Sequence, residues 1–503
     1  VIMPKETLKA FAITVAGVVH GFQDIEISTR SYGDSAPCNN DVACLGGGGN
    51  QGDAVGMIIS GNTRICSGAL INNACQNLRP FFLTADHCVE GQNPQNWVIR
   101  FNYDSPTCGG SEPTEWVTYN GTNLRARHSS SDFALVELVY PVIGQSTLAM
   151  AGWDRADANT TSGFGIHHPK GDVKKISVDF DPSVIEGYGT TGDTHLKVIW
   201  DDGTTEKGSS GSPLFDQSSR VVGQLHGGDT VVCSGNKTSW YGRFFKSWTG
   251  NNSSSTRLSD WLGGNGNPTT TNTVRTPSIS GNSPICTVNK TFVLDDLVPG
   301  YGVTWTVAPT LLFATTGGAS TSGTTTSAIL RALNSNSSGA AVLTFTLIGG
   351  ACDDTIIVSR RIWVGRPNFA IVGNFWYCPG NYGYVSMQYN GQLVSTQEQG
   401  ITNLTWTFQG PLSSFNSQNT SASFIAGPGL GSGVITAIAT NACGTTTVNF
   451  PFVVQACFGG GGSEKSKLVV SPNPSQGIVT VEVKDNIHVL DAMAQSRFQL
   501  FDK

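Results

Sequence analysis

The chain has few charged residues, no basic cluster and no long apolar run. Only 13% of its 503 residues are charged, and the formal net charge is -6. Proteins that bind nucleic acid usually carry a basic patch or stripe, so we expect no DNA or RNA partner. The longest apolar run near the start, residues 11–19, is shorter than the about 20 residues that a membrane-spanning helix needs. We therefore expect no membrane span.

The 12 cysteines lack the paired CxxC spacing that is typical of zinc sites. Cysteines scattered in this way indicate disulfide bonds formed in an oxidising compartment outside the cytoplasm. His167 and His168 are adjacent, but neighbouring residues of a strand point to opposite faces, which argues against a shared metal ion. We expect no metal and no cofactor.

Glycine is abundant, with 61 residues, and serine, threonine and asparagine are also frequent. This composition is typical of short strands joined by tight turns. The chain is also too long for one ordinary domain of about 100 to 200 residues. We expect a mostly β protein that is built from several modules.

The most informative stretch is a turn of small residues, 208–213, which places Ser210 near two glycines. A serine hydroxyl is a weak nucleophile and needs a neighbouring base, which an acid in turn orients. His87 follows the apolar run 81–83, and Asp132 opens another apolar run, so both are expected at strand ends. The order His87, Asp132, Ser210 is the chain order of chymotrypsin-like serine proteases.

Six motifs extend this resemblance to the bacterial lysyl endopeptidases, a branch of the trypsin-like family. They are CSGALINN (66–73), FLTADHC (82–88), AGWDR (151–155), IHHP (166–169), GQLHGG (223–228) and RLSDWL (257–262). The resemblance covers residues 33–263. It implies a protease domain of two antiparallel β-barrels packed together, the chymotrypsin-like double barrel, which acts on protein or peptide substrates.

The resemblance also implies the roles of the site residues. Ser210 would attack the peptide carbonyl, His87 would accept its proton, and Asp132 would orient the imidazole. The backbone N–H groups of Gly208 and Ser210 would form the oxyanion hole. A glycine suits position 208 because a Cβ atom there would crowd the substrate carbonyl.

His226, Gly227 and Gly228 occupy the strand that would pair with the substrate backbone. In the resembling family a histidine at this position stacks on an aromatic residue, and Tyr188 is the candidate here. The alternative interpretation is that His226 serves packing only.

The residue preference depends on the base of the specificity pocket. A pocket that accepts lysine needs a carboxylate, which replaces the lost hydration of the ammonium group. The acid of lysyl endopeptidases falls at Ser239 in this sequence, and the acid of trypsin falls at Thr204. Asp229 is the remaining candidate. Cleavage after lysine is therefore a hypothesis, and a polar pocket for another side chain is the alternative.

Three disulfide bonds are implied by the same resemblance, namely Cys38–Cys233, Cys44–Cys108 and Cys66–Cys88. The last of these would anchor the loop that carries His87.

Residues 1–32 are interpreted as the remnant of a propeptide, with cleavage expected near Arg30. The alternative is an N-terminal strand of the catalytic domain. In trypsin-like zymogens the freed amino terminus pairs with an acid directly before the nucleophile, but here that residue is Ser209. We therefore expect processing to relieve inhibition or complete folding without that ion pair.

A polar segment, 264–275, is predicted to be a linker, and an internal repeat of about 90 residues follows it. Each copy has a cysteine, a tryptophan and a second cysteine, a pattern that suggests two immunoglobulin-like sandwiches resembling PKD modules, at 276–366 and 367–456. We expect the bonds Cys286–Cys352 and Cys378–Cys443. Cys75 and Cys457 are left over, and either pair with each other or stay free.

Residues 457–503 combine a glycine linker with segments that resemble the C-terminal sorting domain of the type IX secretion system of Bacteroidetes, cut short at its end. The resemblance implies the type IX machinery as a partner and a secreted or cell-surface location.

These observations together predict a secreted, monomeric serine endopeptidase. The alternative is a cell-surface adhesin or other binding protein whose protease-like domain is catalytically silent. A module that mainly binds polysaccharide has only the two predicted sandwiches in its favour.

Overall fold

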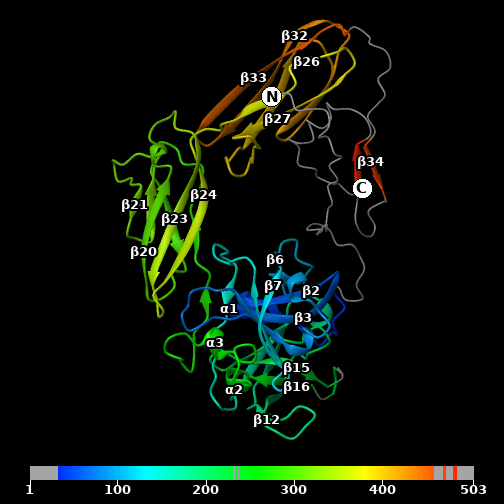
Figure 1. Ribbon diagram of the computed structural model, residues 1–503, viewed down its shortest axis with the longest axis vertical. Helices are drawn as coiled ribbons and strands as arrows, with labels where there is room; N and C mark the ends of the chain where they lie inside the picture. The colour runs from blue at the N-terminus through cyan, green and yellow to red at the C-terminus, as the bar shows by residue number, and fades with distance from the viewer. Residues whose placement is uncertain (1–31, 230–232, 236, 458–467, 472–479, 484–503) are drawn as a thin grey trace, which may run out of the picture. The chain divides into compact units, whose positions relative to one another are not determined.

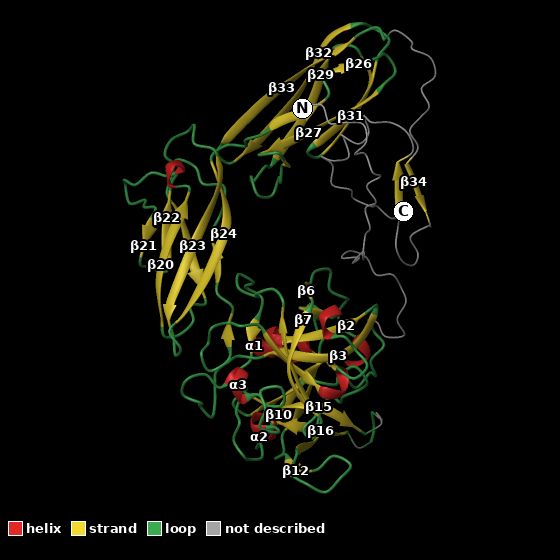
Figure 2. Cartoon of the chain, in the orientation of Figure 1, coloured by secondary structure: helices red, strands yellow, loops and turns green. Residues whose placement is uncertain are grey.

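A computed structural model describes residues 32–229, 233–235, 237–457, 468–471 and 480–483 (Figures 1 and 2). The chain divides into two units, one from both ends of the chain and one from Ile27–Gln455. In the first unit, β34 (Leu468–Ser471) pairs antiparallel with β35 (Thr480–Val483). The predicted propeptide, except Tyr32, and most of the predicted sorting domain lie outside the described residues.

The first half of the protease-like region is a sheet of seven antiparallel strands. In spatial order they are β6 (Val117–Asn120), β5 (Val98–Phe101), β2 (Val55–Ser60), β3 (Thr63–Leu70), β4 (Phe81–Ala85), β8 (Phe133–Leu138) and β7 (Thr122–His128). Every residue of β4 and β8 is buried, which fits their almost unbroken apolar sequences.

The second half is a sheet of eight strands. In order they are β1 (Asn40–Asp41), β11 (Lys175–Asp179), β10 (Gly163–His167), β14 (Pro213–Asp216), β15 (Val221–Gly228), β16 (Thr238–Arg243), β13 (His195–Ile199) and β12 (Val184–Glu186). The helices of this region are short: α1 (Gly49–Ala54), α2 (Phe244–Thr249) and α3 (Ser259–Leu262). The expectation of a mostly β fold is confirmed.

The two sheets share one core. Phe81 and Phe133 of the first sheet and Phe215 of the second belong to the same buried cluster. Trp153 is fully buried in this cluster, and its ring stacks on Phe244. This core brings the end of β4 and the start of β8 close to the loop before β14. The candidate site residues lie at these three places in the sequence.

Two pairs of sheets follow. In the first pair, β18 (Ser278–Ser280), β19 (Lys290–Asp295) and β22 (Ser327–Leu330) share a core with β21 (Ser322–Gly323), β20 (Tyr301–Ala308), β23 (Gly339–Gly349) and β24 (Asp354–Val364). In the second pair, β25 (Ala370–Gly373), β27 (Tyr382–Tyr389), β31 (Ser421–Ala426) and β30 (Leu412–Gln418) share a core with β26 (Trp376–Tyr377), β33 (Gly444–Val454), β32 (Gly431–Asn441) and β29 (Asn403–Gln409). The internal repeat therefore corresponds to two sandwiches, each with one long hairpin.

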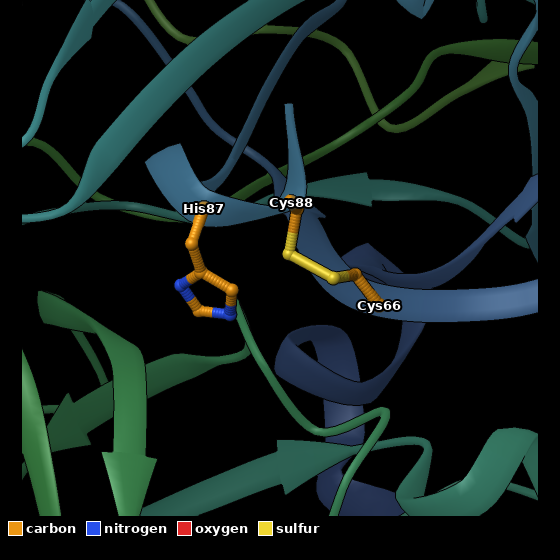
Figure 3. A group of neighbouring side chains, drawn as sticks. All are labelled: Cys66, His87 and Cys88. Carbon is orange, nitrogen blue, oxygen red and sulfur yellow. A yellow bond between two sulfur atoms is a disulfide. The ribbon is translucent and has the colours of Figure 1, made fainter. Parts of the chain in front are cut away.

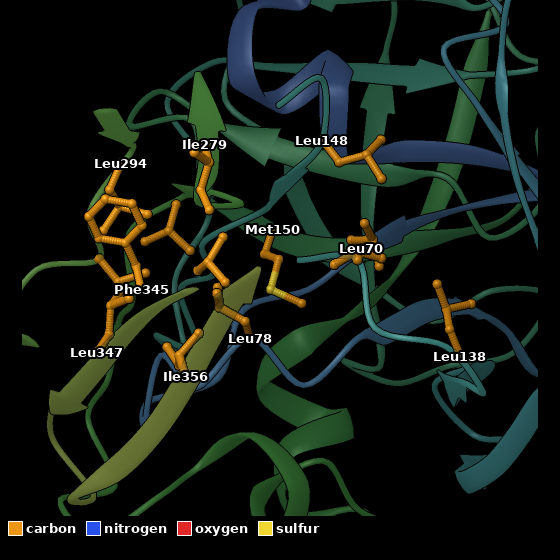
Figure 4. Packing of buried hydrophobic residues seen from close by; sticks show 14 of the residues in the cluster. Leu70, Leu78, Leu138, Leu148, Met150, Ile279, Leu294, Phe345, Leu347 and Ile356 are labelled. Atoms are coloured by element: carbon orange, nitrogen blue, oxygen red, sulfur yellow. The ribbon is translucent and has the colours of Figure 1, made fainter. Parts of the chain in front are cut away.

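The segment 264–275, predicted to be a linker by its composition, is packed against the protease-like region. β17 (Val274–Arg275) pairs with β9 (Ala149–Met150), and Arg155 donates hydrogen bonds to the carbonyl oxygens of Asn267 and Pro268. Leu78, Leu148 and Met150 belong to the same apolar cluster as Ile279 and Leu294 of the first sandwich (Figure 4). The segment connects two modules, but its backbone is held in place.

All 12 cysteines lie within the described residues, and each is disulfide-bonded. The expected bonds Cys38–Cys233, Cys44–Cys108 and Cys66–Cys88 are present. The expected bonds within the sandwiches, Cys286–Cys352 and Cys378–Cys443, are wrong. The structure instead has Cys75–Cys352 and Cys286–Cys443, and Cys378 and Cys457 are also disulfide-bonded.

The geometry of the long hairpins explains this correction. Cys352 lies at the turn between β23 and β24, whereas Cys286 follows Ile285, which bridges to Val364 at the far end of β24. An 11-residue strand spans roughly 35 Å at about 3.3 Å per residue, so the two cysteines of one sandwich lie too far apart to bond. Each hairpin-tip cysteine therefore bonds to the preceding module.

Within the described residues, we find no helix that has both the length and the apolar character needed to cross a membrane.

Candidate active site

His87 is fixed at the end of a buried strand. It follows β4 and lies in the single turn of 3-10 helix Asp86–Cys88. The disulfide bond between Cys66 and Cys88 ties this turn to β3, directly beside the imidazole (Figure 3). The backbone that carries the candidate base is therefore held both by the sheet and by a covalent cross-link.

Asp132 meets His87 from the start of β8. Its Oδ2 atom lies 2.8 Å from Nδ1 of His87, and its Oδ1 atom accepts a hydrogen bond of 2.9 Å from the backbone N–H of His87. Asp132 has a φ of 51°, in the left-handed region that non-glycine residues rarely adopt. Such strain is often found at functional sites, where the surrounding structure holds it in place.

This pairing changes the proton affinity of His87. Burial alone lowers the pKa of His87. The hydrogen bond to Asp132 and the charge of Asp132, with smaller contributions from the charges of Glu90 and Asp86, raise it, and the pKa is raised overall. The geometry also fixes the tautomer, because a neutral ring that donates from Nδ1 to the carboxylate leaves Nε2 as a proton acceptor. Asp132 thus prepares His87 to accept a proton at Nε2.

Asp86, the residue before His87, is not a solvated loop acid. Its side chain is buried and forms an ion pair with Arg127 of β7. A buried carboxylate needs such a partner because desolvation of a charge is costly.

The loop with Ser210 packs closely against the strands that carry His87. Gly211 has a φ of +82°, and a Cβ atom there would lie 2.1 Å from Oγ1 of Thr84 and 2.5 Å from the carbonyl oxygen of Ser67. Only glycine permits this approach. Sγ of Cys88 lies 3.9 Å from the carbonyl oxygen of Ser210, so the loop is adjacent to the turn of His87.

Ser67 of β3 orients this loop. Its backbone N–H donates to the carbonyl oxygen of Ser210 at 2.8 Å, and its Oγ donates to that of Gly208 at 2.8 Å. The N–H of Ser209 donates back to the carbonyl oxygen of Glu206 at 2.9 Å. Among the described residues, no acceptor takes a hydrogen bond from the N–H groups of Gly208 or Ser210. These are the two donors that the sequence predicted for an oxyanion hole.

The structure brings His87 and Asp132 into contact and places Ser210 on an adjacent loop. Within the described part of the chain, no hydrogen bond joins the Ser210 hydroxyl to the His87 ring. Catalytic hydrogen bonds are often long in a site without substrate and shorten when substrate binds.

His226 lies beside the His87–Asp132 pair. Its ring stacks on that of His87 with a centroid distance of 5.6 Å, and its Nε2 lies 3.9 Å from Oδ2 of Asp132. Tyr188, the expected aromatic partner, contacts His226 with a centroid distance of 4.3 Å. Burial lowers the pKa of His226, whereas the pKa of His87 is raised.

His195 is a member of this group that the sequence analysis missed. Its Nε2 lies 3.0 Å from Nδ1 of His226. Burial, followed by repulsion from His226 when that ring is protonated, lowers the pKa of His195 to about 4. His195 reaches the site because β13 pairs with β16, which in turn pairs with β15. No local sequence motif indicates that pairing.

Hydroxyl groups surround the candidate specificity residue Ser239. Ser239 is 1% exposed, accepts a hydrogen bond from Nε1 of Trp200 at 3.0 Å and lies 2.8 Å from Oγ1 of Thr205. Gly228 pairs with Ser239 across β15 and β16. The sequence analysis named Thr204 and missed its neighbour Thr205, the residue that contacts Ser239.

No carboxylate is hydrogen-bonded to Thr204 or Ser239 among the described residues. Asp229 is exposed at the end of β15, and its backbone N–H donates to the carbonyl oxygen of Thr238.

His87, Asp132 and His226 also have three potential metal-ligand atoms within 4.8 Å of one another. Within this group Nδ1 of His87 bonds Oδ2 of Asp132 at 2.8 Å. His167 and His168 do not converge, since His167 bonds Ser209 and Ser177 whereas Nδ1 of His168 bonds the carbonyl oxygen of Asp172.

This site lies in the part of the chain that resembles known proteins. Residues 32–242 match the family described as "Lysyl endopeptidase, C-terminal domain". Over 243 residues the chain is 31% identical to lysyl endopeptidase of Pseudomonas aeruginosa, a match that covers 44% of this chain and 51% of that protein. The chain thus spans about half the length of this relative. Residues 32–242 are thus similar to the C-terminal domain of lysyl endopeptidase.

Among solved structures, the chain is similar to kallikrein-related peptidase 10, with 15% identity, a TM-score of 0.29, and coverage of 40% of this chain and 92% of that one. It is also similar to a Glu endopeptidase in complex with MPD, with 16% identity, a TM-score of 0.29, and coverage of 42% and 92%.

Proposed function

We propose that this protein is a serine endopeptidase that hydrolyses peptide bonds through an acyl-enzyme. The observation that carries the proposal is the His87–Asp132 pair, with its 2.8 Å contact, beside a glycine-bounded loop that presents Ser210 and two unengaged N–H groups. Homology to lysyl endopeptidase supports the same activity.

In this mechanism the hydroxyl oxygen of Ser210 bonds to the scissile carbonyl carbon while Nε2 of His87 takes the hydroxyl proton. The carbonyl oxygen becomes an oxyanion, which the N–H groups of Gly208 and Ser210 stabilise. Asp132 stabilises the imidazolium. Loss of one such oxyanion donor typically costs about 10² to 10³ in rate.

The tetrahedral intermediate then expels the amine, which leaves with the proton from His87. Water repeats the sequence on the acyl-enzyme: His87 takes its proton, the oxygen attacks the ester carbon, and the proton returns to Oγ of Ser210. The acid product leaves, and no external oxidant, metal or cofactor is consumed.

Cleavage after lysine is the finer form of this proposal, and the relative's name supports it. A lysine ammonium needs a carboxylate at the pocket base, whereas the matching positions here carry the hydroxyl groups of Thr204 and Ser239. Asp229, which directly follows β15, would have to reach the ammonium group of the bound lysine.

We further propose that the protease domain, 33–263, is followed by two immunoglobulin-like modules and a sorting domain, in a monomeric protein that is secreted or held at the outer cell surface. The disulfide bonds between successive modules support an extracellular location, since such bonds persist in oxidising compartments.

The proposal is tested by incubating the processed protein with a denatured protein of known sequence and mapping every new terminus by mass spectrometry. A Ser210→Ala variant is the matched control. We expect Ser210-dependent cuts, and cuts after lysine would show that a carboxylate such as Asp229 serves the pocket. A protein without Ser210-dependent cuts would instead be the catalytically silent binding protein.

A further inference from the structure

His167 is a buried polar residue with no part in the mechanism above. It ends β10, is fully buried, and has a hydroxyl group against each ring nitrogen. Its Nδ1 lies 2.8 Å from Oγ of Ser209, the residue directly before Ser210, and its Nε2 lies 3.2 Å from Oγ of Ser177 on β11.

The surrounding hydrogen bonds determine where the imidazole carries its proton. Oγ of Ser177 donates to the carbonyl oxygen of Thr204 at 2.8 Å, so it accepts from Nε2–H of His167. Burial, followed by the charge of Lys175, lowers the pKa of His167 to about 3, so the ring is neutral and Nδ1 is an acceptor. Oγ of Ser209 accepts from the N–H of Glu206 at 3.1 Å and therefore donates its own proton to Nδ1.

Through these bonds His167 holds the loop before Ser210 at two points. One point is the carbonyl oxygen of Thr204, which it reaches through Ser177, and the other is the side chain of Ser209. The N–H of Ser210 belongs to the peptide between Ser209 and Ser210. A change in the backbone angles of Ser209 would therefore redirect this N–H relative to that of Gly208.

We propose that His167 is a positioning residue that holds Ser209 and thereby sets the N–H groups of Gly208 and Ser210 in the geometry of the oxyanion hole. This inference rests on the proposed serine endopeptidase function. Trypsin-like zymogens obtain the corresponding restraint from an ion pair between a freed amino terminus and an acid at this position. Here a hydrogen bond between two neutral, buried groups supplies it within the fold.

The two ring nitrogens can be tested separately. In His167→Asn the amide oxygen takes the place of Nδ1, so the bond to Ser209 is kept. In His167→Gln the terminal amide lies near Nε2, so the bond to Ser177 is kept instead. Ser209→Ala removes the other partner with a small change in volume. Ser183→Ala is the matched control, because Ser183 is also a buried serine whose Oγ accepts a backbone N–H, that of Thr160.

Cleavage by the unmodified protein is measured first, so that failure of the proposed function is recognised on its own. We then expect Ser209→Ala and His167→Gln to lower kcat at least about tenfold with KM within about twofold. The reason is that the oxyanion develops after substrate has bound, in the transition state and the tetrahedral intermediate. His167→Asn should retain kcat within about threefold, and Ser183→Ala should lower only the melting temperature. Folded Ser209→Ala and His167→Gln variants with unchanged kcat, or with losses confined to KM, would overturn the inference.

A measurement without catalysis supports the same assignment. In protein labelled with ¹⁵N-histidine, the signal that disappears in His167→Asn should show a neutral ring with its proton on Nε2 from pH 5 to 8. A proton on Nδ1, or an imidazolium in this range, would contradict the hydrogen-bond arrangement on which the inference depends.

Discussion

At the scale of single residues, the site combines one histidine of raised pKa with neighbours of lowered pKa. Asp132 raises the pKa of His87, whereas burial lowers that of His226 and His195. The ring of His226 lies between the other two and contacts both His87 and His195. His87 is therefore expected to keep its proton to a higher pH than either neighbour.

The pH dependence of cleavage should report this arrangement. His87 must be neutral to accept the proton of Ser210, so kcat/KM should rise with pH through its raised pKa, above the usual 6.5. Asp132→Asn removes the interaction that raises the pKa, so the acid limb should move to lower pH while kcat falls by about 10⁴. Profiles recorded for both proteins check this, and an unchanged acid limb in the variant would contradict the assigned pairing.

The approach of the Ser210 loop to β4 should depend on Gly211. In Gly211→Ala the new Cβ atom would clash with Thr84 and the backbone of Ser67, and the left-handed φ would add strain. We therefore expect the free energy of unfolding to fall by about 2 to 4 kcal/mol and most of the activity to be lost. Gly61→Ala is the control, because Gly61 has a φ of +59° with nothing within 4 Å of its Cβ position. Denaturant unfolding measures the stability of both variants. Equal losses of stability would mean that the close approach of the loop to β4 does not cause the effect.

At the scale of elements, local motifs predicted the site residues that follow or precede a single strand. They did not predict the residues that strand pairing brings to the site from another part of the sheet. The sequence predicted His87, Asp132 and Ser210 as site residues because each sits in a short segment with its own pattern. His195 and Thr205 were missed because they reach the site through the pairing of β13 with β16 and through a side-chain contact to Ser239. Strand order in the second sheet is not readable from any single segment.

The long hairpins show the same limit. The repeat of cysteine, tryptophan and cysteine was recognised, but a bond within each copy was assumed from sequence spacing. Strand length decides otherwise, since β23 and β24 carry Cys352 away from Cys286. The lengths of those strands could not be fixed from alternating apolar residues alone.

Peptide mapping under non-reducing conditions tests the corrected bonds. We expect one cross-linked pair that contains Cys75 with Cys352 and another that contains Cys286 with Cys443. Recovery of a Cys286–Cys352 peptide would contradict the arrangement of the first sandwich.

At the scale of the whole molecule, the protease-like region and the first sandwich form a continuous structure. Their apolar side chains belong to one cluster, β17 pairs with β9, and the bond Cys75–Cys352 joins them. The activity that we propose depends on the first region, but the stability of that region is expected to depend on both.

Removing the sandwiches should therefore expose apolar surface. A protein that ends at Arg275 would leave Leu78, Leu148 and Met150 without their partners, and its melting temperature and solubility should be lower than those of a protein that ends at Arg366. Differential scanning calorimetry and light scattering compare the two. Equal stability and solubility would show that the shared cluster contributes nothing measurable.

The central claim, that Ser210 is an activated nucleophile, is tested most directly by labelling the protein with a fluorophosphonate and locating the label by peptide mass spectrometry. We predict a label on Ser210 and none on its neighbours Ser209 and Ser212, with labelling abolished in Ser210→Ala and greatly slowed in His87→Ala. A folded protein that takes up no label, or that is labelled at another residue, would contradict the account.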